Sequence, residues 1–155
     1  SKKIIRQVIK ISKKYGKIII GDPKKNDLSV YSNIDILTPN QKEITASAKK
    51  KFLSEGDIIK FSRKLIKDYK IQGLLITRSE NGMLLVNNND VYKINASAKK
   101  VNDVTGAGDT VVSVLALMLS IGLSMYDSVL IANYAAGLVV QKYGTETLTY
   151  KDIVD

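Results

Sequence analysis

The sequence predicts an α/β fold with a mainly parallel sheet, and three observations lead to this prediction. Helical apolar stripes alternate along the chain with short continuous apolar runs, as expected for strands buried between helices. Serine and carboxylate residues at capping-box spacing, together with glycines, mark where helices begin and end. No linker, low-complexity stretch or internal repeat interrupts the 155 residues, so we expect one domain over residues 1–155.

In the first half of the chain, a helical stripe over 3–15 ends at Gly16, and 17–21 is predicted to be a buried strand. A second strand is expected over 34–37, and a helix should begin at Thr38-Pro39-Asn40. Ser54 and Asp57 form a capping-box pattern. The helix behind them carries its apolar residues on one side, namely Ile58, Phe61, Leu65, Ile66 and Tyr69.

The second half begins with the apolar strand Gly73–Thr77. Asn81-Gly82 is a strong hairpin dipeptide, and it leads to strands over 83–86 and Val91–Ile94. Two helices are then expected, over 109–121 and 124–143. Ser124 and Asp127 repeat the capping-box pattern, and Gly144 is expected to close the last helix.

Composition excludes several kinds of chemistry. With no cysteine, neither a disulfide nor a thiolate metal site can form, and with no histidine, any general base must be Asp, Glu, Lys or Tyr. The longest apolar run, 111–119, is far shorter than the roughly 20 residues of a membrane span. The first residues lack the apolar core of a signal peptide. We expect a soluble, cytoplasmic protein with no membrane partner.

The net charge of +9 raises the question of a nucleic-acid partner. The lysines are scattered in short clusters at 24–25, 49–51 and 99–100, and aromatic residues make up only 6% of the chain. A solvated basic surface is the favoured interpretation, with no nucleic acid bound. An RNA-binding module stays as an alternative that strong salt dependence of binding would reveal.

The segment Gly106-Ala107-Gly108-Asp109 carries the main functional prediction. Small residues let the backbone approach a phosphate, and the helix behind them adds the positive end of its dipole. Asp109 can take the proton of an attacking hydroxyl while the N–H groups stabilise the transferring phosphoryl group. This combination indicates a kinase. The alternative is that Asp109 caps the helix and the glycines only make a turn.

The wider segment 103–110 resembles the DTxGAGD signature of the ribokinase/phosphofructokinase B family of sugar kinases. Further segments resemble that family in the expected order: Asn40-Gln41-Lys42-Glu43 its N-x-x-E motif, 77–82 a nucleotide-binding turn, and 132–137 a late helix bordering the adenine. The resemblance implies a ribokinase-like fold, with this chain as the C-terminal half of a three-layer α/β/α domain.

The resemblance also implies roles for single residues. Asp109 would be the general base, and the N–H groups of Gly106, Ala107 and Gly108 would form the anion hole for ATP. Asn40 and Glu43 would order Mg²⁺, mainly through water, and Asp103 with Thr105 would hold a monovalent cation, K⁺. The nucleotide site would be lined by Thr77, Arg78, Gly82 and Asn133.

Structural alternatives stand beside three of these roles. Glu43 could serve only as a first-turn carboxylate that favours the helix dipole. Asn133 could have a packing or solvent role inside its helix. Arg78, like Lys24, could be a solvated loop cation instead of a phosphate ligand.

Four segments are similar to one subgroup, the kinase part of bifunctional ADP-heptose synthases: 22–24, 37–40, 77–83 and 142–145. This similarity implies ATP-dependent phosphorylation of D-glycero-D-manno-heptose 7-phosphate at its anomeric hydroxyl, a step toward the lipopolysaccharide core. Alternatives are a kinase of ribose, fructose or another small sugar, and a non-catalytic nucleotide-binding fragment. Because chains of this family are roughly twice as long, we expect this one to need the missing N-terminal half or an oligomeric partner for turnover.

Overall fold

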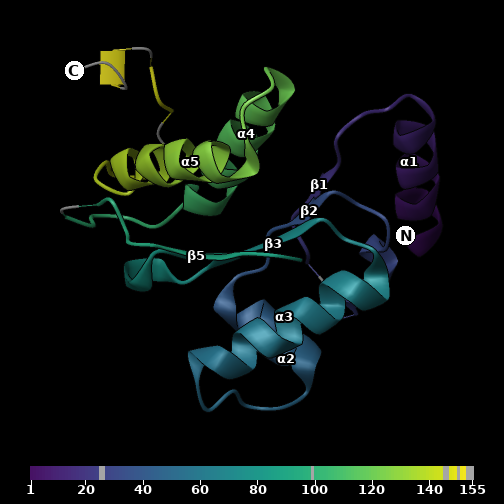
Figure 1. Cartoon of the computed structure of the whole chain (residues 1–155). Helices are drawn as coiled ribbons and strands as arrows, with labels where there is room; N and C mark the ends of the chain where they lie inside the picture. Colours follow the sequence, from purple (N-terminus) through teal and green to yellow (C-terminus); the bar gives the residue numbers. More distant parts are fainter. Residues whose placement is uncertain (25–26, 99, 145–146, 150, 153–155) are drawn as a thin grey trace. The chain divides into compact units, whose positions relative to one another are not determined.

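The computed structural model describes residues 1–24, 27–98, 100–144, 147–149 and 151–152 (Figure 1). The chain divides into two compact units, one made of Ser1–Arg78 with Leu84–Lys93 and the other of Ser79–Met83 with Ile94–Asp155. Lys25, Lys99 and Thr145, which belong to segments discussed above, lie outside the described residues. Within the described part, no helix combines the length and apolar character that crossing a bilayer requires.

A five-stranded sheet forms the centre of the first unit. Its strands lie in the order β1 (Ile20–Gly21), β2 (Ile36–Leu37), β3 (Gly73–Thr77), β4 (Met83–Asn87) and β5 (Val91–Ile94). β1, β2 and β3 are parallel neighbours. The links from β3 to β4 and from β4 to β5 are hairpins, because a parallel crossover needs about a dozen residues or more. The predicted α/β fold is confirmed, with parallel strands first and hairpin strands last.

Two of the helices, α2 (Gln41–Ala48) and α3 (Glu55–Tyr69), lie together on one side of this sheet (Figure 1). Both begin with a capping box, as the sequence predicted for α3. One apolar core joins them to β3, with buried members that include Ile44, Ile58, Leu65, Ile66, Leu74 and Ile76. Helix α1 (Lys2–Lys14) and the short 3-10 helix η1 (Leu28–Tyr31) add Ile9 and Leu28 to the same core.

The two strands predicted over 17–21 and 34–37 are shorter than expected, since only Ile20–Gly21 and Ile36–Leu37 are strands. The backbone explains the difference. The N–H groups of Asp35 and Ile36 both donate to the carbonyl of Ile19, which interrupts regular pairing at this end. The Asp35 carboxylate also binds this segment, since it accepts from the Ile19 N–H at 2.8 Å and pairs with Lys13 at 2.6 Å.

The second unit contains α4 (Ala107–Ser120) and α5 (Met125–Val139), which pack against each other. The helix predicted over 109–121 begins two residues earlier, directly after Gly106 at φ 81°. The helix predicted over 124–143 ends at Val139, not at Gly144. The carbonyl of Val140 accepts from the N–H groups of Asn102 and Asp103, so this stretch forms turns that hold the preceding loop.

Candidate functional site

The loop that leads into α4 is held by its own side chains and by the turn after α5. The Oδ1 of Asp103 accepts hydrogen bonds from the N–H and the hydroxyl of Thr105, at 2.9 and 2.7 Å. Its Oδ2 accepts from the N–H of Gly144 at 3.2 Å. The Thr105 hydroxyl, followed by these backbone donors, lowers the pKa of Asp103. Asp103 and Thr105, predicted as a cation-binding pair, therefore lie together in one hydrogen-bonded turn.

The first turn of α4 presents unused backbone donors. The N–H groups of Gly106, Gly108 and Asp109 make no hydrogen bond within the described residues, whereas the N–H of Ala107 donates to the carbonyl of Val104 at 3.2 Å. Free N–H groups at a helix N-terminus attract anions, and the helix dipole adds to the attraction. The donors available for a phosphate are thus those of Gly106, Gly108 and Asp109, with the N–H of Ala107 already engaged.

Asp109 is exposed, and its carboxylate makes no hydrogen bond or ion pair within the described part of the chain. A capping carboxylate accepts from the backbone N–H of the N-cap residue. No such bond forms between Asp109 and Gly106, so the alternative in which Asp109 only caps its helix lacks its defining contact.

Within the described residues, nothing in the structure requires glycine at position 108. A Cβ at this position would meet no atom within 4 Å, and its φ lies outside the left-handed region. Glycine inside a helix costs roughly 0.5–1 kcal/mol relative to alanine. A glycine that neither the backbone conformation nor packing demands is expected where a ligand must approach the backbone closely.

In the first unit, three predicted residues meet at the carboxyl ends of β2 and β3. Asn40, which lies beyond the end of β2, forms a parallel bridge with Thr77, the last residue of β3. Asn40 and Glu43 form a reciprocal capping box, with distances of 2.9 Å from the Glu43 N–H to Asn40 Oδ1 and 2.8 Å from the Asn40 N–H to Glu43 Oε2. Glu43 therefore has a structural role at the start of α2, as its helix-dipole alternative requires. The position also suits a ligand, because α/β folds bind ligands at the carboxyl ends of parallel strands.

Arg78, which follows Thr77, lies against α3. Its Nη1 is 2.6 Å from Oε2 of Glu55, and Nζ of Lys93 on β5 is 2.5 Å from Oε1. Hydrogen bonds from Lys93 and then Arg78 lower the pKa of Glu55. Arg78 is thus no solvated loop cation, since only 12% of its side chain is exposed. No sequence signal marks Glu55 as its partner, because the two residues lie far apart along the chain.

Gly82 and Asn133, both in the second unit, lie against the chain that leaves β5. A Cβ on Gly82 would be 2.0 Å from the carbonyl oxygen of Ile94, and Gly82 has φ 71°. The side chain of Asn133 is buried and donates from Nδ2 to the carbonyl of Asn95 at 2.9 Å. Both residues therefore have packing roles, and their predicted contact with nucleotide stays a prediction. Asn95 was not singled out from the sequence.

The described residues contain no group of three acidic side chains that could hold a metal ion directly. For Mg²⁺, the capping box leaves Oε1 of Glu43 without a hydrogen bond among the described residues, and one carboxylate oxygen can accept from a metal-bound water. This fits the predicted contact through water. For K⁺, the fit is poorer, because both oxygens of Asp103 already hold the loop.

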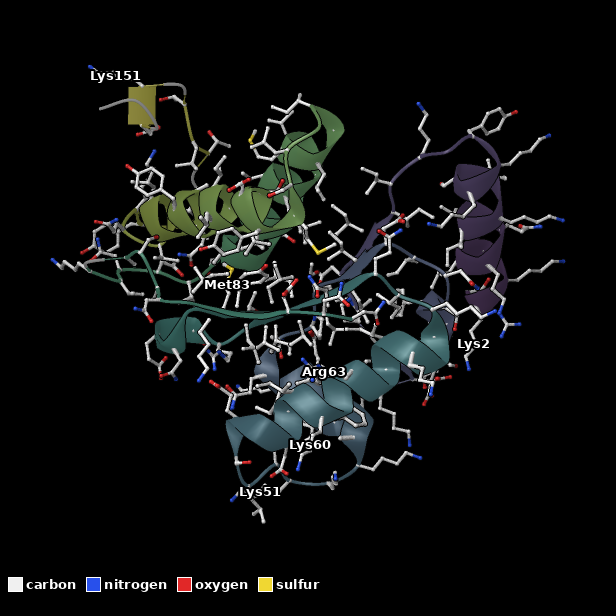
Figure 2. All side chains as sticks on the ribbon, in the orientation of Figure 1. Lys2, Lys51, Lys60, Arg63, Met83 and Lys151 are labelled. Carbon is white, nitrogen blue, oxygen red and sulfur yellow. The ribbon has the colours of Figure 1, made fainter. Side chains whose placement is uncertain are left out.

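Two of the lysines lie on the surface of the first unit. Lys51 and Lys60 stand on the outer side of the layer that α2 and α3 form, pointing away from the sheet (Figure 2). This agrees with the solvated surface expected from the scattered lysines.

Comparison with known proteins decides the family. The model of the pfkB family carbohydrate kinases matches residues 1–152. This chain belongs to the pfkB family of carbohydrate kinases. It is 45% identical over 148 residues to the bifunctional protein HldE of Haemophilus influenzae (strain PittEE) and 41% identical over 150 residues to that of Shewanella piezotolerans. Each alignment covers 95% of this chain and 31% of the relative, so the chain spans about a third of these relatives.

Solved structures show the pfkB kinase fold for the chain. Phosphofructokinase-2 from Escherichia coli in complex with potassium superposes with a TM-score of 0.87 at 23% identity, over 99% of this chain and 50% of its own. Ribokinase from Arabidopsis thaliana, complexed with ribose and ATP, gives a TM-score of 0.82 at 28% identity, over 93% of this chain and 48% of its own. The predicted ribokinase-like fold is confirmed.

Proposed function

We propose that this chain is the ATP-binding and catalytic half of a kinase that phosphorylates D-glycero-D-manno-heptose 7-phosphate at its anomeric hydroxyl. Membership of a carbohydrate kinase family supports the reaction class, and identity of 41–45% to proteins named HldE supports the substrate. The observation that supports the catalytic part is the start of α4, where three N–H groups and the Asp109 carboxylate make no hydrogen bond among the described residues.

In the proposed reaction, Asp109 accepts the proton of the sugar hydroxyl as its oxygen attacks the γ-phosphorus of ATP. The bond from phosphorus to the β,γ-bridging oxygen breaks, and ADP leaves. The N–H groups of Gly106, Gly108 and Asp109 donate to the phosphoryl oxygens, where negative charge must be stabilised. Positioning supplies much of the rate in such transfers, so we expect the chain to bind ATP and to need an acceptor pocket for turnover.

Asn40 and Glu43 would hold the hydration shell of Mg²⁺, which neutralises phosphate charge when it is bound. Thr77, at the end of β3 beside Asn40, would contact the nucleotide, with Arg78, Gly82 and Asn133 as further predicted contacts. Asp103 and Thr105 would support a monovalent cation with the lone pairs that the loop hydrogen bonds leave free. The family and this chemistry suit the cytoplasm, where ATP and sugar phosphates are available.

The test is a substrate panel on the protein expressed from its native locus, so that any further segment or partner chain is present. ATP and Mg²⁺ are supplied with heptose 7-phosphate, fructose 6-phosphate or ribose, and ADP release is measured. Turnover with heptose 7-phosphate far above the others is expected. Turnover only with another sugar would contradict the substrate. ATP binding without turnover on any sugar would favour a non-catalytic nucleotide-binding protein.

A further inference from the structure

The chain between β5 and α4 is attached to α5 at two places (Figure 1). At the first, the carbonyl of Asn95 accepts from Nδ2 of Asn133 at 2.9 Å, and the Ser97 hydroxyl donates to the carbonyl of Asn133 at 2.8 Å. A Cβ on Gly137 would be 2.0 Å from Oγ of Ser97, so the glycine lets this segment reach the helix backbone. The second attachment, nearer to α4, is made by Asn102.

Asn102 caps the C-terminal end of α5 from outside the helix. The last carbonyls of a helix have no partner within it, so they need donors from elsewhere. The backbone N–H of Asn102 donates to the carbonyl of Val140, the C-cap residue, at 2.7 Å. Its side-chain Nδ2 donates to the carbonyl of Gln141, the next residue, at 2.5 Å. One loop residue thus satisfies two consecutive carbonyls at the end of α5.

The position of Asn102 is transmitted to the first turn of α4 over a short distance along the chain. Only three residues separate Asn102 from Gly106, the N-cap of α4. Two of these three, Asp103 and Thr105, are hydrogen-bonded to each other, which leaves this stretch little freedom to absorb a shift. A displacement of Asn102 therefore displaces the N–H groups of Gly106 and Gly108.

The side chain of Asn102 makes the bond in this attachment that depends on residue type. The backbone N–H groups of Asn102 and Asp103 would donate to Val140 with almost any side chain at position 102. The bond to the carbonyl of Gln141 needs a side-chain donor. Asn102 is partly buried, where water replaces a lost hydrogen bond incompletely. Removing the amide is therefore expected to loosen the attachment without abolishing it.

We propose that Asn102 is a positioning residue, which uses the end of α5 to hold the first turn of α4 in place for the terminal phosphate of ATP. The inference rests on the proposed function, in which the γ-phosphate lies at this turn and the nucleotide contacts Asn133 on α5. Helix α5 then sets the distance between the two ends of the bound nucleotide, and Asn102 is the link that passes this distance on to α4.

The test compares the binding of ADP with that of a non-hydrolysable ATP analogue, both with Mg²⁺, by calorimetry on the protein expressed from its native locus. The ratio of the two affinities isolates the contribution of the terminal phosphate. Asn102→Leu keeps nearly the same side-chain size, adds no charge and removes the donor. It is expected to lower the ratio about tenfold, the equivalent of about one hydrogen bond to a charged group, and to leave the affinity for ADP unchanged. If Asn102→Leu does not fold, Asn102→Ala, which adds no bulk, is measured in its place with the same expectation.

Ser124→Ala is the matched control, because it removes a hydrogen-bonded cap from the other end of α5 and does not touch the loop before α4. It should lower the melting temperature by a few degrees, as Asn102→Leu does, and leave the affinity ratio unchanged. An unchanged ratio in Asn102→Leu, or an equal fall in Ser124→Ala, would overturn the positioning role while the proposed function stands. If the wild-type protein itself binds the analogue no more tightly than ADP, the proposed phosphate site at α4 is wrong, and the positioning role with it.

Discussion

Asp57 and Asp109 occupy the same position, the third residue of their helices, yet only Asp57 is used as a cap. Oδ2 of Asp57 accepts from the N–H groups of Leu53 and Ser54, at 3.2 and 3.1 Å, and its N–H donates to the Ser54 hydroxyl. Asp109 follows a glycine N-cap and makes no such bond. An aspartate at the third helical position thus caps α3, whereas the aspartate at the same position in α4 is available for a ligand.

Substitution of these two aspartates is expected to separate stability from catalysis. Asp109→Asn should lower turnover of the native-locus protein by roughly 10²–10⁴-fold, because the proposed general base is lost. It should leave ATP affinity and the melting temperature of the chain unchanged. Asp57→Ala should lower the melting temperature by a few degrees and leave turnover intact. ADP release, calorimetry and thermal melting measure these quantities, and near-normal turnover of Asp109→Asn would remove Asp109 as the base.

Gly108 and Gly56 offer a second matched pair, since each is the second residue of its helix and precedes an aspartate. Alanine at either site meets no close contact, the nearest atom being the Ser54 hydroxyl oxygen at 3.5 Å from a Cβ on Gly56. Both variants should be as stable as wild type or up to about 1 kcal/mol more stable. Gly108→Ala should weaken ATP–Mg²⁺ binding about tenfold by blocking the phosphate, the equivalent of about 1.4 kcal/mol. Calorimetry showing equal affinity for both variants would contradict a phosphate at α4.

Gly82 is expected to be needed for folding. Gly82→Ala would place a Cβ 2.0 Å from the Ile94 carbonyl oxygen, so the hairpin and the chain after β5 must separate. Gly16→Ala is the control, because Gly16 also has a positive φ, of 62°, but open space around it. The control should cost about 1–2 kcal/mol, and Gly82→Ala clearly more. Urea unfolding measures both, and equal losses would show that the close approach has no energetic weight.

The ion pairs of Glu55 predict a pH-dependent contribution to stability. Because the folded state lowers its pKa from the ordinary 4.5, the carboxylate stabilises the fold fully above that pH, and the contribution is lost as the pH falls through the lowered value. Glu55→Gln should melt about 2–4 °C below wild type at pH 7, and the difference should shrink below pH 4.5. A difference that stays constant with pH would contradict the ion-pair origin.

Local signals predicted the fold well where one residue type dictates geometry. The Ser54 capping box, the Asn81-Gly82 turn and the strand Gly73–Thr77 are all as expected, because caps and glycines act over a few residues. At Ser124 only half of the predicted capping box forms. The Asp127 N–H donates to the Ser124 hydroxyl, which itself donates to the Asp127 carboxylate at 2.6 Å, so the reciprocal bond to the Ser124 N–H is missing. Helix α5 ends early because Val140 bonds to Asn102, a contact distant in sequence.

The candidate site shows the same difference between local signals, which can be predicted, and contacts distant in sequence, which cannot. The helix start at the glycines and Asp109 could be predicted from one short segment, because a helix N-terminus depends on consecutive residues, and its catalytic role stays a prediction. The engagement of the Ala107 N–H by Val104 depends on the exact turn and could not be predicted. Nor could the partners of Arg78 and Asn133, which are Glu55 and the carbonyl of Asn95, because tertiary contacts alone bring them together.

The most direct measurement is a crystal structure of the chain with Mg²⁺ and a non-hydrolysable ATP analogue. We expect the terminal phosphate within hydrogen-bond distance of the N–H groups of Gly106 and Gly108, with the carboxylate of Asp109 facing it. A terminal phosphate bound elsewhere, with the first turn of α4 unoccupied, would rule out the proposed phosphate site.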